Sequence, residues 1–73
     1  MEDLVIDAVY DDEARVWVVD HAGLSLVTEA ESLDVLTYKL QELIPELAEL
    51  NGLELPRPIH FSIVAHRQAL AFA

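Results

Sequence analysis

The chain contains no cysteine, and this absence removes several kinds of chemistry at once. Disulfide bonds, thiolate zinc sites and cysteine nucleophiles are excluded, and a cysteine-free chain is typical of a reducing cytoplasm. Only two glycines are present, so neither of the glycine-rich loops that cradle phosphates can form. No run approaches the roughly 20 apolar residues that span a membrane, and Met1-Glu2-Asp3 is not the start of a signal peptide. We therefore expect a soluble, cytoplasmic protein.

Basic residues are also scarce. Four Lys and Arg stand against fourteen Asp and Glu, which gives a formal net charge of −10. A field of this sign repels phosphate backbones and attracts basic partners, so the composition argues against direct binding of nucleic acid. The excess acid has a second explanation, because it can simply keep a small apolar protein in solution.

Seventy-three residues make one domain, with no room for a separate DNA-binding domain. A chain of this length buries only about 60–65% of its unfolded surface, so its stability is marginal without help. Its hydrophobic content of 53% is high for the length. Either the core is rich for its size or apolar surface is shared with a second copy. We favour the second interpretation and expect a homodimer, formed through an open sheet edge or the free sheet face.

Three segments in the first thirty residues alternate as strands do. They are residues 4–10, 15–20 and 24–29. The polar cluster Asp11-Asp12-Glu13 suits a tight turn, so the first two strands should form an antiparallel hairpin. Between the second and third strands, we expect Gly23 to supply a backbone angle that other residues avoid.

A leucine-striped helix is predicted from about Ser32 to Asn51. Ser32 is the expected N-cap, and Asn51-Gly52 is a stop signal. The stripe occupies an arc of about 100°, widened slightly by Ile44, and consists of Leu33, Leu36, Leu40, Leu43, Leu47 and Leu50. Pro45 interrupts the hydrogen bonding but not the phase of the stripe, which predicts one kinked helix, with two short helices as the alternative.

A fourth strand is expected over residues 59–66, after the extended segment Pro56-Arg57-Pro58. Residues 69–73 are apolar and could extend this strand, pack on a neighbouring molecule or stay loose. The order of elements is β-β-β-α-β. It predicts an α+β domain in which an antiparallel sheet carries the kinked helix on one face.

The residues that bear chemistry do not assemble into a recognisable site. His60 and His66 share a face of the last strand but lie about 20 Å apart along it, too far to share a metal. Asp7 and Asp20 lie on adjacent strands and are candidates for a divalent-metal site with a histidine, although turn and solubility roles explain such carboxylates equally simply. We expect no catalytic residue, no bound metal and no cofactor.

Several segments resemble a known pattern. They are Glu13-Ala14-Arg15-Val16-Trp17-Val18, Gly23-Leu24, Thr28-Glu29-Ala30, Ser32-Leu33, Leu43-Ile44-Pro45-Glu46-Leu47 and Leu50-Asn51-Gly52. The chain is similar, from about residue 4 to residue 66, to a small bacterial family known only as a domain of unknown function, within the HicB-like antitoxin group. The most specific part is residues 43–47 with residues 50–52. The resemblance implies the same β-β-β-α-β fold.

The resemblance also implies a function. HicB-type antitoxins bind and cover small basic ribonuclease toxins of the HicA type, so it implies a non-catalytic interaction module that sequesters such a partner. An acidic antitoxin would match a basic toxin electrostatically. The carboxylates expected to meet the partner are Asp11, Asp12, Glu13, Asp20, Glu42, Glu46 and Glu49. The alternative is a stand-alone oligomeric protein of unassigned role, with no toxin partner.

Overall fold

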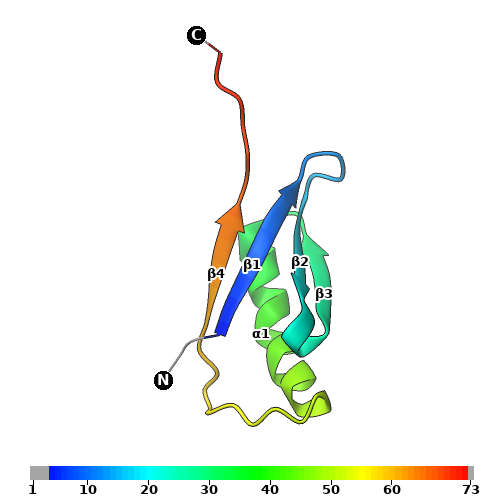
Figure 1. Ribbon diagram of the computed structural model, residues 1–73, viewed down its shortest axis with the longest axis vertical. Coiled ribbons are helices and arrows are strands. Elements are labelled where there is room, and N and C mark those ends of the chain that lie inside the picture. Colours follow the sequence, from blue (N-terminus) through cyan, green and yellow to red (C-terminus); the bar gives the residue numbers. More distant parts are fainter. Residues whose placement is uncertain (1–3, 73) are drawn as a thin grey trace.

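The computed structural model describes residues 4–72, which form a two-layer α+β domain (Figure 1). Its elements are β1 (Leu4–Asp11), β2 (Val16–His21), a short 3-10 turn η1 (Ala22–Leu24), β3 (Leu26–Ala30), α1 (Leu33–Leu50) and β4 (Phe61–His66). The predicted fold class and the order β-β-β-α-β are confirmed. The turn η1 was not predicted, and it takes Leu24 out of the third strand.

The four strands form one sheet in the order β3-β2-β1-β4. The pairs β1–β2 and β2–β3 are antiparallel, but β4 runs parallel to β1, with Leu4 beside Phe61 and Ala8 beside Ala65. The prediction of a wholly antiparallel sheet is therefore wrong. The physical reason is the direction of the chain: α1 carries it back along the sheet, so β4 runs the same way as β3 and β1.

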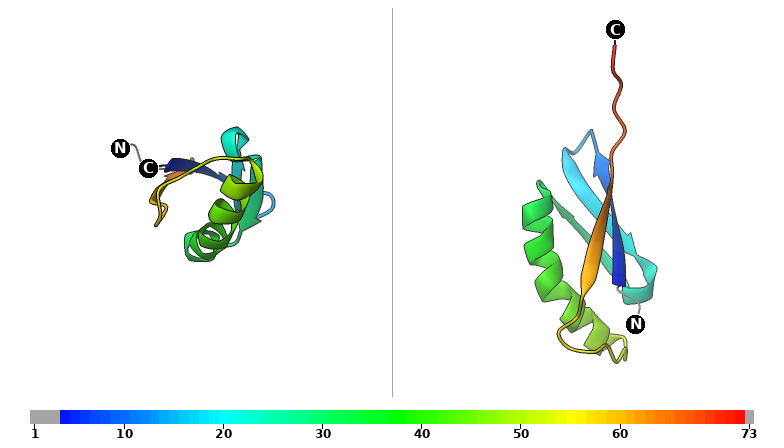
Figure 2. Two further views of the ribbon diagram at one scale, coloured as in Figure 1. Left: turned by 90° about the horizontal axis from the view of Figure 1, so that it is seen from below. Right: turned by 90° about the vertical axis from the view of Figure 1, so that its left-hand side faces the viewer.

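The helix covers one face of the sheet and leaves the other bare (Figures 1 and 2). Alternate side chains of the strands point toward the helix, and the burial follows that period of two. Ile6, Ala8 and Val19 are fully buried there, and Leu26 is almost so. Trp17 and Phe61 are partly buried and pack against this core.

Both ends of α1 are capped as the sequence predicts. At the N-terminus the Ser32 hydroxyl accepts a hydrogen bond from the Val35 amide at 3.1 Å. At the C-terminus Gly52 has φ +68°, and its amide donates to the carbonyl of Glu49. The Leu53 amide donates to the carbonyl of Ala48 at 2.8 Å, which completes a Schellman motif. Local chemistry therefore fixes the length of the helix.

The buried line of α1 differs from the leucine stripe. Leu36, Leu40, Ile44 and Ala48 are buried at successive spacings of four, while Leu50 is 76% exposed. Ile44 thus lies at the centre of the apolar face rather than at its margin. The helix runs without interruption through Pro45, which excludes the alternative of two short helices.

The expectation for Gly23 is wrong. In the connections between the first three strands, the residues with positive φ are Arg15, at 58°, and Ser25, at 52°. The φ of Gly23 is not positive. Ser25 ends η1 in the left-handed conformation, and its amide donates to the carbonyl of Ala22. Gly23 instead allows a close approach, because a Cβ there would lie 3.1 Å from Cε1 of His21.

Residues 67–72, called the arm below, continue from β4 in an extended conformation and leave the domain (Figure 1). The dimensions of 50 × 24 × 20 Å and the radius of gyration of 13.7 Å reflect this projection. A compact domain of the same length would have a radius of gyration of about 11 Å. The predicted apolar ending therefore forms neither a strand nor part of the core within the described residues. Ala73 lies outside them.

Candidate protein-interaction surface

The bare side of the sheet, opposite α1, is the candidate functional surface (Figure 2). We call it the uncovered face. Its side chains are those that alternate with the buried ones, and the exposed members are Val5, Asp7, Val9, Asp11, Asp20, Val27, Glu29, Ser62, Val64 and His66. Val18 lies among them and is half-buried. A sheet face without a covering layer ordinarily carries polar side chains in these positions.

The uncovered face carries an unusual number of valines. Val9 is 55% exposed and Val27 is 73% exposed, and Val5 and Val64 also project into solvent. Val9 lies directly opposite Val18 across the β1–β2 pair, so apolar side chains are neighbours on adjacent strands. Grouped exposed apolar residues on a small domain mark a surface that another molecule covers.

Carboxylates lie among these valines. Asp20 pairs with Val27 across β2 and β3, and Glu29 pairs with Val18 on the same two strands. Asp7 pairs with Val64 across β1 and β4. Continuing the β1–β2 register by one residue places Asp7 opposite Asp20. The face therefore combines apolar area with negative charge, which is the chemistry that a basic and partly apolar partner would match.

Two side chains on this face form a hydrogen bond. Nε2 of His66 on β4 is 3.0 Å from Oδ1 of Asp7 on β1. Both side chains are more than half exposed, so water screens the interaction and its contribution to stability is small. The contact links the two parallel strands but leaves Asp20 and Glu29 available to a partner.

The acidic residues predicted to meet a partner fall into three separate places. Asp11 ends β1, and Asp12 and Glu13 lie in the turn that follows, where Oδ1 of Asp11 accepts hydrogen bonds from the amides of Glu13 and Ala14. Asp20 lies on the uncovered face, in the middle of the sheet.

The remaining three acidic residues of the predicted set lie on the helix, in the layer opposite the uncovered face. Glu42, Glu46 and Glu49 are exposed on the side of α1 that faces away from the sheet. They occupy the second half of the helix, whereas the turn between β1 and β2 lies at the end of the molecule where the helix begins (Figure 1). No single flat partner can therefore touch the predicted set together. Of its seven members, Asp20 lies within the uncovered face and Asp11 lies at its end, where β1 enters the turn.

The histidines have separate surroundings. Nδ1 of His21 accepts a hydrogen bond from the Leu24 amide at 3.2 Å, so it caps η1. His66 contacts Asp7, and His60 precedes β4 with its carbonyl accepting from the Leu4 amide. Across residues 4–72 no three His, Cys, Asp or Glu side chains are grouped so that they could hold a metal ion.

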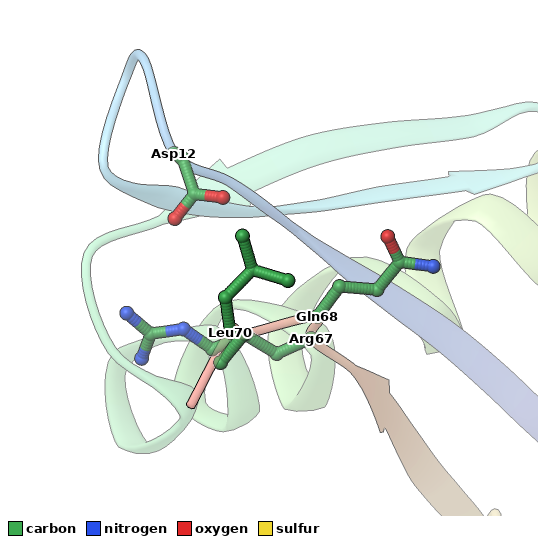
Figure 3. A pocket seen from close by; sticks show the side chains of 5 residues that line it. Asp12, Arg67, Gln68 and Leu70 are labelled. Atoms are coloured by element: carbon green, nitrogen blue, oxygen red, sulfur yellow. The ribbon is translucent and has the colours of Figure 1, made fainter. Parts of the chain in front are cut away.

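The arm exposes its apolar side chains. Leu70 is 83% exposed and Phe72 is 87% exposed. A shallow open hollow lies between the arm and the turn after β1, lined by Asp12, Arg67, Gln68, Ala69 and Leu70 (Figure 3). The Arg67 guanidinium lies 3.9 Å from the centre of the Tyr10 ring, which anchors the start of the arm against β1. In the sequence, the arm is indicated by the run of apolar residues, 69–73, that follows the last predicted strand.

These features define a class: a small two-layer domain in which a mixed four-stranded sheet is covered by one helix and presents its other face to solvent. The family follows from comparison. A family model described as a domain of unknown function, DUF1902, matches residues 3–73, and the chain belongs to that family.

A solved structure supports the same assignment. The hypothetical protein TTHA1013 from the extremely thermophilic bacterium Thermus thermophilus is 38% identical, and the alignment covers 97% of this chain and 100% of that one with a TM-score of 0.81. No curated protein matches the chain.

None of the helices among residues 4–72 has the length and apolar character needed to cross a membrane.

Proposed function

We propose that this domain is a non-catalytic interaction module of the antitoxin type, which sequesters a small basic ribonuclease toxin on its uncovered face. One observation carries the proposal: valines and carboxylates are interleaved on a sheet face that no part of the described chain covers. The resemblance to a small family within the HicB-like antitoxin group, which is most specific in residues 43–47 and 50–52, supports the same function.

The physical basis has two parts. Covering the exposed valines removes apolar surface from water, which stabilises a complex by about 25 cal/mol for each Å² buried. Lysine and arginine side chains of a basic partner would meet Asp20 and Glu29, whose carboxylates project from neighbouring strands. The net charge of −10 would also steer the partner toward the domain, so association should be fast and should weaken as salt is added.

The test is recovery of the partner from the native host, followed by measurement of affinity. The tagged domain should retain a small basic protein with ribonuclease activity at low salt, release it at high salt, and inhibit it in a cleavage assay. An adjacent gene that encodes such a protein would identify the partner to use. If no small basic protein is retained and the adjacent gene encodes none, the antitoxin proposal fails.

A charge-matched pair of variants locates the binding surface. Asp20→Asn with Glu29→Gln removes two charges from the uncovered face, and Glu42→Gln with Glu46→Gln removes two from the outer side of the helix. We expect the first pair to weaken partner binding at least tenfold and the second to change it less than threefold. Equal losses for both would mean that net charge, and not this surface, determines binding.

A second candidate function is a stand-alone oligomeric protein in which the acid serves solubility. The exposed apolar arm favours it, because Leu70 and Phe72 need an apolar environment whatever else the domain binds. A purified protein that self-associates but retains no basic partner would support this alternative.

A further inference from the structure

The charges of the chain are divided unequally along its length. All fourteen Asp and Glu residues lie between Glu2 and Glu54, whereas the segment from Leu55 to Ala73 contains none and carries Arg57 and Arg67. That acid-free segment includes β4 and the arm, which run together as one extended stretch, residues 61–72.

Two copies of this protein repel each other because each carries a net charge of −10. They can meet with least repulsion where the pairing strands carry no carboxylate of their own, and β4 with the arm is such an edge; the neighbouring Asp7 carboxylate contacts His66. The other open edge, β3, carries Glu29 and leads into Glu31. It is also partly occupied, because Nζ of Lys39 donates to the backbone carbonyl of Glu29 at 2.6 Å. The charge distribution therefore selects β4 over β3 for self-association.

The free edge of β4 has backbone groups that could form hydrogen bonds with another strand. The carbonyl of His60 accepts from the Leu4 amide, which fixes the residues of β4 that face β1. By the alternation of a parallel ladder, the amides and carbonyls of Phe61, Ile63 and Ala65 point away from β1, at the free edge. Unpaired groups of this kind are the usual template for an added strand.

We propose that the protein is a homodimer in which the arm of each copy lies antiparallel along β4 of the other. The lengths match, because six arm residues at about 3.3 Å each span the same distance as the six residues of β4. The two-fold axis passes near Arg67, and the stacking of its guanidinium on Tyr10 turns the two like charges away from each other. This inference does not require the toxin partner, although the added strand lies beside Val64, at the edge of the uncovered face.

The proposed register brings apolar side chains together. In one extended strand, alternate residues share a face, so Leu70 and Phe72 lie on the side of Val64 and Ser62. Antiparallel pairing about Arg67 sets Leu70 of one copy opposite Val64 of the other, where both are exposed in the single chain. The dimer therefore places Leu70 and Phe72 beside apolar side chains of the other copy, whereas the monomer leaves them surrounded by water.

The first test is the mass in solution by analytical ultracentrifugation at tens of micromolar. We expect twice the chain mass of 8.2 kDa for the natural sequence. Leu70→Ser with Phe72→Ser should raise the dimer dissociation constant more than tenfold, whereas Leu50→Ser with Val27→Ser, a similarly exposed apolar pair elsewhere, should leave it within threefold. A natural protein that stays monomeric, or an arm variant that dimerises as before, overturns the proposal.

The absence of natural cysteine allows a direct test of the pairing. Val64→Cys and Leu70→Cys in one chain lie six extended residues apart, about 20 Å, too far for a bond within a copy. Across the proposed interface they are opposite, so mild oxidation should give a disulfide-linked dimer, and Leu70→Cys alone should give none. Failure of the double variant to cross-link overturns the arm-to-β4 arrangement.

Salt gives a third readout that also separates this dimer from the complex with a basic partner. Added sodium chloride screens the repulsion between two acidic copies, so the dimer should tighten, while a complex with a basic toxin should weaken. A dimer that dissociates as salt rises would contradict an acid-free interface.

Discussion

The side-chain amide of Asn51 donates a hydrogen bond to the backbone carbonyl of Leu24 at 3.0 Å and another to the carbonyl of Leu47 at 2.7 Å. Leu24 lies in the turn η1 between β2 and β3, 27 residues earlier in the chain. A single side chain thus joins the end of the helix to the connection between two strands. The contact with Leu24 is not a property of the helix alone, so it fixes where the helix lies on the sheet.

Replacement of Asn51 by alanine should lower the free energy of unfolding by about 1–2 kcal/mol, because the Leu24 carbonyl loses its side-chain donor. Asn51→Asp keeps the size but has no N–H to donate, so it should cost at least as much. Urea denaturation measures the difference. The control is Glu46→Ala, an exposed change on the same helix that should stay within about 0.5 kcal/mol. Equal stability of Asn51→Ala and Glu46→Ala would contradict the structural role of Asn51.

The N-cap predicts a second stability change. Ser32→Ala removes the acceptor for the Val35 amide and should cost about 1 kcal/mol. Ser32→Asp supplies an equivalent oxygen at the positive end of the helix dipole and should restore most of that loss. Ser62→Ala, at an exposed position of β4, serves as the matched control in thermal denaturation. A cap role is ruled out if the aspartate variant is as unstable as the alanine variant.

Two leucines of the predicted stripe should respond very differently to the same change. Leu40 is completely buried, so Leu40→Ala should cost about 2–5 kcal/mol, a large part of the stability of a 73-residue domain. Leu50 is mostly exposed, and Leu50→Ala should change the free energy of unfolding by less than about 0.5 kcal/mol. Chemical denaturation of both variants checks this. Similar losses would mean that Leu50 is covered in solution.

Substitutions at Gly52 test the energetic cost of its backbone conformation without a contribution from side-chain packing. Its φ is +68°, and a Cβ added there meets nothing within 4 Å. Gly52→Ala should therefore cost about 1 kcal/mol through the left-handed backbone alone. Gly52→Asn should cost less, because asparagine tolerates that conformation better than alanine does. The order glycine, asparagine, alanine in melting temperature is the expected result, and alanine above asparagine would contradict it.

The parts of the fold that could be predicted are those determined by neighbouring residues. Ser32 and Asn51-Gly52 cap the helix through side chains and backbone within one turn, so its limits were readable from the sequence. The alternation in β1 and β2 likewise predicted their hairpin. Gly23 was misjudged because the position that needed positive φ lies two residues later, and Ser25 accepts that conformation at the end of η1.

The parts that were missed depend on contacts distant in sequence. Parallel pairing of β4 with β1 follows from the return path of the helix, which periodicity does not report. The burial of Ile44 and the exposure of Leu50 depend on which part of the helix lies over the sheet. The candidate surface was only partly predictable for the same reason. Acidic residues can be counted from the sequence, but their separation onto the turn, the uncovered face and the outer side of α1 requires the fold.

The segment most characteristic of the resemblance, residues 43–47 and 50–52, acts structurally in this protein. Ile44 fills the core, Asn51 binds Leu24 and Gly52 ends the helix. These residues hold the helix in place on the sheet of this protein. They do not form the uncovered face, whose side chains come from the strands.

The parallel pairing of β1 with β4 has a consequence for how the protein is made. As the chain leaves the ribosome, β1, β2, β3 and α1 emerge first and can assemble, but one edge of β1 stays unpaired until residues 61–66 follow. Pairs such as Leu4 with Phe61 close the longest loop in the sheet, and contacts of this kind form late and slowly. The nascent domain therefore passes through a stage with an exposed central strand, when it is most prone to associate with other chains.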